Sequence, residues 1–153
     1  MPSHYTGTEE EKRALGLFIK LMRAADSVAT RVSHRTGLGG LTPTQFGVLE
    51  ALLHLGPLSP CQLAAKHLMS RNNLSVVIKN LERDGLIYRV PDPNDRRAHV
   101  IHLTDNGRTR IEAAFPPHVE AVVAEMQALS PEQQEQLGAL LRQLGRGAKD
   151  PDG

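Results

Sequence analysis

The sequence predicts a mainly α-helical fold with one small β-hairpin. Apolar residues recur at three- and four-residue spacing over most of the 153-residue chain, as on amphipathic helices. Two short helical segments near the middle are separated by a turn of about three residues, which is the helix-turn-helix spacing. A β-prone segment, a polar turn and an alternating segment follow them. This order of elements is that of a winged helix-turn-helix.

Composition narrows the classes of function. The chain has a single cysteine, Cys61, so it cannot form an internal disulfide, and we expect a reducing cytoplasm. No run of about 18 apolar residues occurs, and residues 1–11 do not resemble a signal or transit peptide, so we expect no membrane partner. His99 and His102 point to opposite faces of a strand, and no CxxC or HExxH motif occurs. We therefore expect no metal and no other cofactor.

Charge is distributed unevenly along a chain whose formal net charge is +1. Residues 60–110 carry nine Lys and Arg against five Asp and Glu, whereas residues 111–153 carry three against seven. A basic middle beside an acidic end indicates a nucleic-acid face in the middle of the chain.

The first helix spans residues 9–36 and ends at the glycine-rich segment 37–40. Thr42 caps a second helix whose first residue is Pro43, and Gly56-Pro57 end it. The buried face of this second helix is predicted to be Phe46, Leu49, Leu52 and Leu53.

The helix-turn-helix follows directly. Ser59 and Gln62 form a capping box for a short third helix that runs to about Leu68. Ser70 caps the fourth helix, which ends at Asp84-Gly85. The fourth helix is then the recognition helix of the motif.

The wing is predicted from residues 86–90 and 98–103, which are β-prone and alternating. The intervening segment 91–95 contains two prolines with Asp and Asn, so we expect it to form a turn that cannot continue a strand. The tip of the predicted wing carries Arg96 and Arg97.

Two further helices complete the chain. Thr104-Asp105 caps a long helix that Pro116-Pro117 should kink or interrupt near Phe115. Ser130 caps the last helix, whose apolar face is Leu137, Leu140, Leu141 and Leu144.

The recognition helix has two distinct faces. Leu74, Val77, Ile78 and Leu81 share the core face, and a polar stripe lies opposite to it. Asparagine can pair with an adenine edge and a small apolar group can meet a thymine methyl, whereas cations contact phosphates. The alternative is an ordinary solvated face. The expected DNA-contacting residues of this helix are Ser70, Arg71, Asn72, Asn73, Ser75, Val76, Lys79, Asn80 and Arg83.

Four motifs in order resemble the MarR family of bacterial transcription regulators. They are LTPTQF at 41–46, LERDGLIYR at 81–89, DPNDRR at 92–97 and LTDNG at 103–107. Residues 21–24 and 115–119 are most similar to the MhqR-like branch. The resemblance covers about residues 9–146 and implies a winged-helix DNA-binding domain over 41–110, with a helical dimerisation region formed by 1–36 and 111–153.

The resemblance also implies how DNA is bound. In this family the terminal helices interleave into a homodimer, so two recognition helices would read double-stranded DNA at a near-palindromic operator. One wing arginine enters the minor groove. We assign that role to Arg96 and expect Asp92 or Asp95 to pair with Arg97 and fix the wing. The alternative is a surface ion pair without function.

Relatives in this family bind aromatic or phenolic effectors between the DNA-binding lobe and the dimer helices. The resemblance therefore implies a repressor released by such a small molecule. The residues expected to line the effector pocket are Met22, Arg23, Val32, His34, Phe46, Leu49 and Ile111.

Two alternatives remain open. A thiol-based repressor would sense oxidants through Cys61, which lies at the second position of a helix, where the dipole favours the thiolate. More remotely, the winged helix would be a protein-interaction module. An enzyme with Cys61 as nucleophile is disfavoured because no base and no nucleotide-binding loop accompany it. The sequence leaves the effector, the operator and the choice between repressor and activator undetermined.

Overall fold

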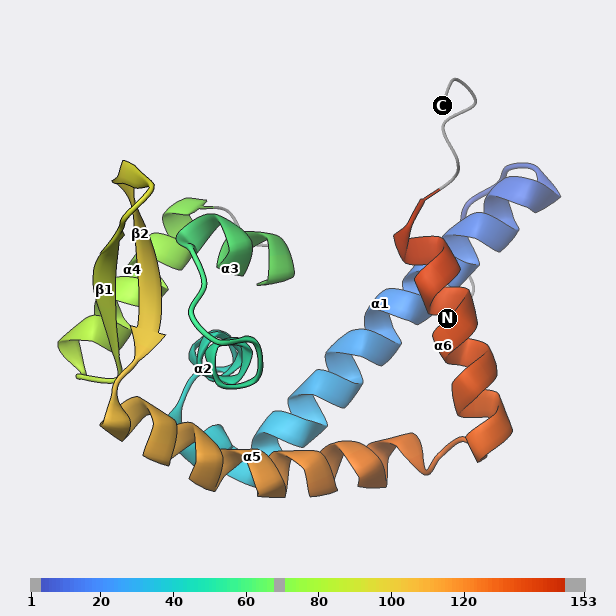
Figure 1. Ribbon diagram of the computed structural model, residues 1–153. Coiled ribbons are helices and arrows are strands. Elements are labelled where there is room, and N and C mark those ends of the chain that lie inside the picture. The colour runs from blue at the N-terminus through green and yellow to red at the C-terminus, as the bar shows by residue number, and fades with distance from the viewer. Residues whose placement is uncertain (1–3, 68–70, 148–153) are drawn as a thin grey trace.

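A computed structural model describes residues 4–67 and 71–147 of the chain. Figure 1 shows a lobe made of α2, α3, α4 and the hairpin over one half of the long helix α5, with α1 and α6 toward its other end. The order of elements is α1 (Glu9–Thr36), the short 3₁₀ helix η1 (Gly37–Gly40), α2 (Pro43–Leu55), α3 (Pro60–His67), α4 (Arg71–Arg83), β1 (Ile87–Asp92), β2 (Asp95–Leu103), α5 (Asp105–Met126) and α6 (Pro131–Gly145).

Local capping fixes where several helices begin. The side chains of Thr42 and Ser130 each accept a hydrogen bond from the backbone three residues on, while a glutamine side chain at that position bonds back to the cap. Ser59 and Gln62 exchange the same pair of bonds, 2.9 and 3.2 Å long. Each box satisfies backbone donors that a helix N-terminus leaves unpaired. The predicted starts of α2, α3 and α6 are confirmed, whereas the predicted cap Ser70 lies outside the described residues.

The core lies inside the winged lobe. The predicted α2 residues Phe46, Leu49 and Leu52 are buried, Leu53 packs against the core from its edge, and Val48 is fully buried as well. The other elements of the lobe surround α2 (Figure 1). Several faces of this helix are therefore buried, and its apolar residues are not confined to one stripe. The remaining core residues are Leu38, Leu41, Leu58, Leu63, Ala64, Leu74, Ile78, Leu81, Leu86, Ile87, Ile101, Ile111 and Ala114.

Proline behaves differently from the prediction in two places. Strand β1 continues through Pro91, which pairs with His99, and the register breaks only between Pro91 and Asp92. The hairpin has two strands, so β1 has a free edge where a missing amide donor costs no ladder bond. In α5, Pro116 and Pro117 lie within an uninterrupted helix. Of the predicted kink or interruption, the interruption is therefore wrong, and α5 spans the molecule as one element (Figure 1).

Hydrogen bonds and ion pairs attach helix α5 to other parts of the chain. Thr104 Oγ1 donates to Gly85 O at 2.6 Å, which ties the start of α5 to the turn after α4. Further along, Arg110 Nη2 donates to Gly39 O in η1 at 3.0 Å. Near its end, Glu125 accepts from Arg31 Nε at 2.8 Å and also pairs with Arg35 of α1. These contacts make α5 a connection between the winged lobe and α1.

The terminal helices have apolar faces that this chain leaves uncovered. None of the residues of α6 is buried. On α1, Leu17, Phe18 and Met22 are all more than half exposed. Within the part of the chain that the structure describes, no helix is long and apolar enough to cross a lipid bilayer.

Candidate nucleic-acid interface and cavity

Helix α4 presents the two faces that the sequence predicts. Leu74, Ile78 and Leu81 are buried in the core, with at most 2% of each side chain exposed. The opposite face is open, and its apolar member, Val76, is 59% exposed. Such a helix face has the donor, acceptor and methyl groups that read base edges in a major groove. Of the predicted DNA contacts, Asn72, Asn73, Ser75, Val76, Lys79 and Arg83 are exposed and Asn80 is half-buried.

Two predicted contacts are not fully described. Ser70 lies outside the described residues, and Arg71 is the first residue of α4 but its side chain is not described. At the other end of the helix, Arg83 Nε donates to Asp84 Oδ1 at 3.1 Å, so its charge is partly balanced within the chain.

The wing tip is shaped by two aspartates, though not as predicted. Asp92 Oδ1 accepts from the backbone N–H of Asn94, and Asp95 Oδ1 accepts from the backbone N–H of Arg97, both at 2.9 Å. The expected ion pair between one of these carboxylates and Arg97 does not occur among the described residues, because the carboxylates are used to fold the turn. The side chains of Arg96 and Arg97 are exposed.

Backbone and side-chain hydrogen bonds fix the base of the wing to the lobe. Leu58, between α2 and α3, exchanges backbone hydrogen bonds with Ile101 of β2, 2.8 and 3.2 Å long. Arg89 of β1 donates two side-chain hydrogen bonds to Glu82 of α4. The hydrogen bonds and the charge of Glu82 raise the pKa of Arg89. The wing and the recognition helix are therefore held as one unit.

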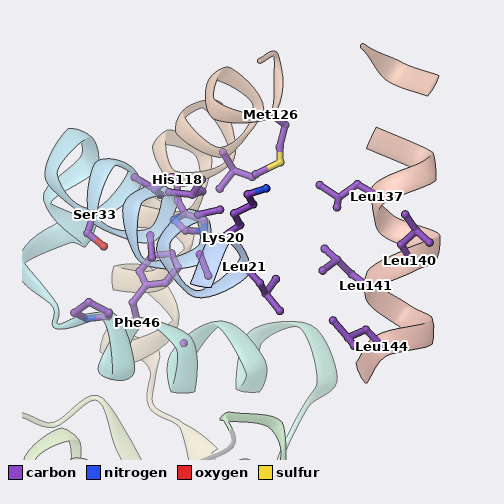
Figure 2. A pocket seen from close by; sticks show the side chains of 18 of the residues that line it. Lys20, Leu21, Ser33, Phe46, His118, Met126, Leu137, Leu140, Leu141 and Leu144 are labelled. Carbon is purple, nitrogen blue, oxygen red and sulfur yellow. The ribbon is translucent and has the colours of Figure 1, made fainter. Parts of the chain in front are cut away.

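A partly open cavity of about 970 Å³ lies between α1, α2, α5 and α6. Its walls are mostly aliphatic, and Figure 2 shows the leucines of α6 facing Leu21, Met126 and the aromatic end at Phe46 and His118. Lys20 and Glu50 are the charged residues of this lining. The size and lining suit a small apolar ligand.

The predicted effector residues are only partly at this cavity. Val32 and Phe46 line it. Leu49 and Ile111 do not, because both are fully buried in the core. Met22, Arg23 and His34 lie on the exposed surface of α1 and are not part of the lining either. Sequence reasoning missed His118 and the leucines of α6, which come to line the same cavity only through the tertiary fold.

Two histidine nitrogens near the cavity are enclosed without a hydrogen-bond partner among the described residues. They are His118 Nδ1 and His67 Nε2. The His118 ring lies against Phe46, with 4.6 Å between ring centroids, and 6.2 Å from the ring of Phe115. His67, the last residue of α3, lies against Gly47 of α2.

The other candidate residues do not form a site. Cys61 is exposed at the second position of α3. Among the described residues, no group of three or more histidine, cysteine or acidic side chains could hold a metal ion.

The geometry defines a class of protein, namely a winged helix-turn-helix DNA-binding regulator with helical extensions. Residues 39–98 match the family model described as MarR family. The chain is 36% identical over 137 residues to the uncharacterized HTH-type transcriptional regulator YkoM of Bacillus subtilis, covering 90% of this chain and 89% of YkoM. This protein belongs to the MarR family and is a transcription regulator rather than an enzyme.

Two further relatives add detail. The HTH-type transcriptional regulator MhqR of Bacillus subtilis is 32% identical over 138 residues, covering 90% of this chain and 95% of MhqR. The solved structure of Bordetella bronchiseptica BpsR, whose DNA binding is regulated by 6-hydroxynicotinic acid, superposes with a TM-score of 0.77 at 25% identity. That match covers 85% of this chain and 98% of BpsR.

Proposed function

We propose that this regulator is a cytoplasmic homodimeric repressor that binds a near-palindromic operator and is released by a small aromatic effector. The observation that carries the proposal is the cavity between α2 of the DNA-binding lobe and the terminal helices. A ligand there contacts both parts of the molecule at once. It can therefore favour one arrangement of the two parts over another.

Dimerisation is supported by the uncovered apolar faces of α1 and α6. Phe18 and Met22 of α1, both outside the cavity lining, are each more than half exposed, and none of the residues of α6 is buried. A second copy of the chain would remove these side chains from water, and burial of apolar area is the main driving force for such association. In a two-fold dimer, the recognition helices would be about 34–36 Å apart, one turn of DNA.

Operator binding is supported by the joined geometry of α4 and the wing. In this proposal α4 enters the major groove, where Asn72 and Val76 read base edges and Lys79 contacts phosphate. Arg96 enters the minor groove, and Arg97 lies beside it on the wing. Release by an effector is supported by BpsR, which is regulated by an aromatic acid.

The test combines operator selection with effector titration. Purified full-length protein is used to select duplexes from a random pool, and the affinity for the selected duplex is measured by fluorescence anisotropy at several salt concentrations. We expect a selected near-palindrome, a steep salt dependence and weaker binding when a phenol or an aromatic acid is added. Cys61→Ser should keep the release. Salt-insensitive binding or the absence of any preferred duplex would contradict the proposal, and loss of release in Cys61→Ser would favour the thiol-sensing alternative.

A further inference from the structure

We propose that Arg110 of α5 determines which spacing of operator half-sites this regulator accepts, although it belongs to neither the recognition helix nor the wing. Arg110 is a positioning residue in this proposal, because it acts through the backbone turn that joins α1 to the DNA-binding lobe. The inference rests on the proposed homodimer, since spacing matters only to a protein with two DNA-binding lobes.

The chain passes from α1 toward α2 through four consecutive residues with positive φ. The angles are 60° at Gly37, 48° at Leu38, 62° at Gly39 and 79° at Gly40. Among residues 4–67 and 71–147, Leu38 is the one residue other than glycine with a positive φ. Its Cβ makes this conformation costly, and the burial of its side chain in the core of the lobe offsets that cost. The turn is therefore a strained connection that its surroundings must hold in place.

Arg110 holds this turn from the side of α5. Its Nε and Nη2 both donate to the carbonyl oxygen of Gly39, at 3.3 and 3.0 Å. The two elements also approach closely here, because a Cβ at Gly39 would lie 3.0 Å from the Cβ of Ala114. A carbonyl group held by two N–H groups has a fixed direction. The turn therefore cannot relax against α5 without breaking both hydrogen bonds.

The place of this contact in the fold connects it to the recognition helices. At the start of α5, Thr104 donates to Gly85 in the turn after α4. Near its end, Glu125 of α5 accepts from Arg31 of α1 at 2.8 Å. The Arg110 contact lies between these contacts, where the end of α1 reaches α5 and the chain enters the lobe (Figure 1). Without it, the lobe can turn relative to α1, which carries part of the proposed dimer face.

The spacing of half-sites is a sensitive measure of this geometry. One inserted base pair moves a half-site by about 3.4 Å along the duplex and turns it by about 35° around the axis. Linked binding modules gain about 10²–10⁴ in affinity only when both can engage at once. A dimer whose lobes are held firmly should therefore discriminate between spacings. A dimer with looser lobes should tolerate the insertion better and bind the matched operator less tightly, because more freedom is lost on binding.

The test compares three duplexes with the full-length protein by fluorescence anisotropy. They are the selected operator, the same operator with one base pair inserted between its half-sites, and a single half-site. The wild type should bind the operator at least about 100-fold more tightly than the half-site, and the insertion should remove most of that gain. Arg110→Met keeps a long side chain without a donor. It should lower the ratio of operator affinity to insertion affinity by about fivefold, as the loss of one net hydrogen bond provides.

Two further variants separate positioning from charge and stability. Arg110→Lys retains a donor and should recover part of the spacing ratio. Arg108→Met is the matched control, because Arg108 is also an exposed arginine of α5 but pairs with Glu112 of the same helix, at 3.8 Å. It removes the same charge and should keep the wild-type ratio, and both methionine variants should bind the half-site equally. Circular dichroism checks that each variant is folded.

A distance measurement tests the motion itself without DNA. Cys61 is the single cysteine of the chain and is exposed on α3, so it takes a spin label directly. A second label is placed on α1 through Ser27→Cys, at another exposed position. Pulsed electron resonance on labelled protein diluted with unlabelled protein reports distances within one chain. Arg110→Met should broaden the distribution of distances, and Arg108→Met should not.

The outcomes separate this inference from the proposed function. An unchanged spacing ratio in folded Arg110→Met, or an equal change in Arg108→Met, would overturn the inference and leave the homodimeric repressor standing. A changed ratio with an unchanged distance distribution would also overturn it, because Arg110 would then not act by holding the lobe. A wild type that binds the operator no more tightly than the half-site would instead contradict the proposed homodimer.

Discussion

Arg89 of β1 and Glu82 of α4 form a two-bond ion pair, with Nε to Oε1 at 2.7 Å and Nη2 to Oε2 at 2.9 Å. The planar guanidinium matches the carboxylate, so the pair fixes direction as well as distance. Glu82 lies in the last turn of the recognition helix, and Arg89 lies in the strand that leads to the wing tip. The pair therefore sets the angle between the two elements that we propose contact DNA.

The first prediction concerns this pair. Arg89→Lys keeps the charge but loses the second hydrogen bond, so the wing should become looser relative to α4. Because both side chains are about one-third exposed, we expect a loss of only ~0.5–1 kcal/mol in the free energy of unfolding. Operator affinity should nevertheless fall several-fold, because the wing is no longer held at its angle to α4.

Anisotropy titration and thermal unfolding of the same samples measure the two effects. Lys12→Gln is the control, because it removes an exposed ion pair with Glu9 on α1, far from α4 in the chain. Equal operator affinity for Arg89→Lys and the wild type would show that the pair does not orient the wing.

The second prediction separates reading of bases from contact with phosphates. Lys79→Ala should weaken binding to all sequences and reduce the salt slope by roughly one unit, since one phosphate contact is lost. Asn72→Ala should instead relax the preference at one base position, by ~1–3 kcal/mol. The measurement is affinity for a set of single-base operator variants. A uniform loss in both variants would rule out a base-reading role for Asn72.

Local structure was predictable here because its causes lie close together in the chain. The caps Thr42, Ser59 and Ser130 each bond to residues three positions away, so the sequence displays both partners. Likewise the buried face of α4 follows from helical periodicity alone.

Tertiary features of the site were not predictable in the same way. Leu58 pairs with Ile101, and His118 approaches Phe46. Both contacts join segments that are far apart in the chain, and the hydrophobic periodicity of the sequence does not show that they meet. The use of Asp95 for the turn rather than for Arg97 depends on the geometry of the hairpin. The leucines of α6 were predicted to be an apolar face, but the sequence does not show which cavity they face.

The third prediction concerns the wing. Arg96→Ala and Arg97→Ala should each weaken specific binding while leaving the fold unchanged, because both side chains are exposed at the tip and form no ion pair among the described residues. The larger loss is expected for Arg96, and mostly at A·T-rich flanks of the operator, where a narrow minor groove attracts a cation. Unchanged affinity in the double variant would exclude the wing as a DNA contact.

The fourth prediction concerns dimerisation through α6. Sedimentation of the wild type at micromolar concentration should give about twice the chain mass of 16.7 kDa. Leu140→Asp places a charge on the apolar face of α6 and should produce monomers with weak operator binding, because burial of a carboxylate opposes association. Ala139→Asp is the matched control, since at about 100° per residue Ala139 lies away from the centre of the apolar face that Leu137, Leu140, Leu141 and Leu144 form. A monomeric wild type would refute the dimer.

The last prediction concerns a contact between the cavity wall and the helix-turn-helix. Gly47 of α2 lines the cavity and also lies against His67, the last residue of α3. A Cβ at position 47 would come within 2.8 Å of His67 Cε1, so Gly47→Ala should displace this imidazole, which belongs to the last residue of α3. Alanine favours the helix by ~1 kcal/mol over glycine, so the variant should keep its helical content. Operator affinity should nevertheless fall, because α3 directly precedes the recognition helix.

Anisotropy titration of Gly47→Ala, His67→Ala and the double variant tests this contact. In the double variant the smaller side chain at 67 leaves room for the new methyl group, so operator affinity should recover relative to Gly47→Ala. The coupling between the two positions, taken from the double-mutant cycle, should lie in the range of about 0.5–3 kcal/mol seen for residues in contact. Additive effects of the two substitutions would mean that His67 does not transmit changes at the cavity wall to α4.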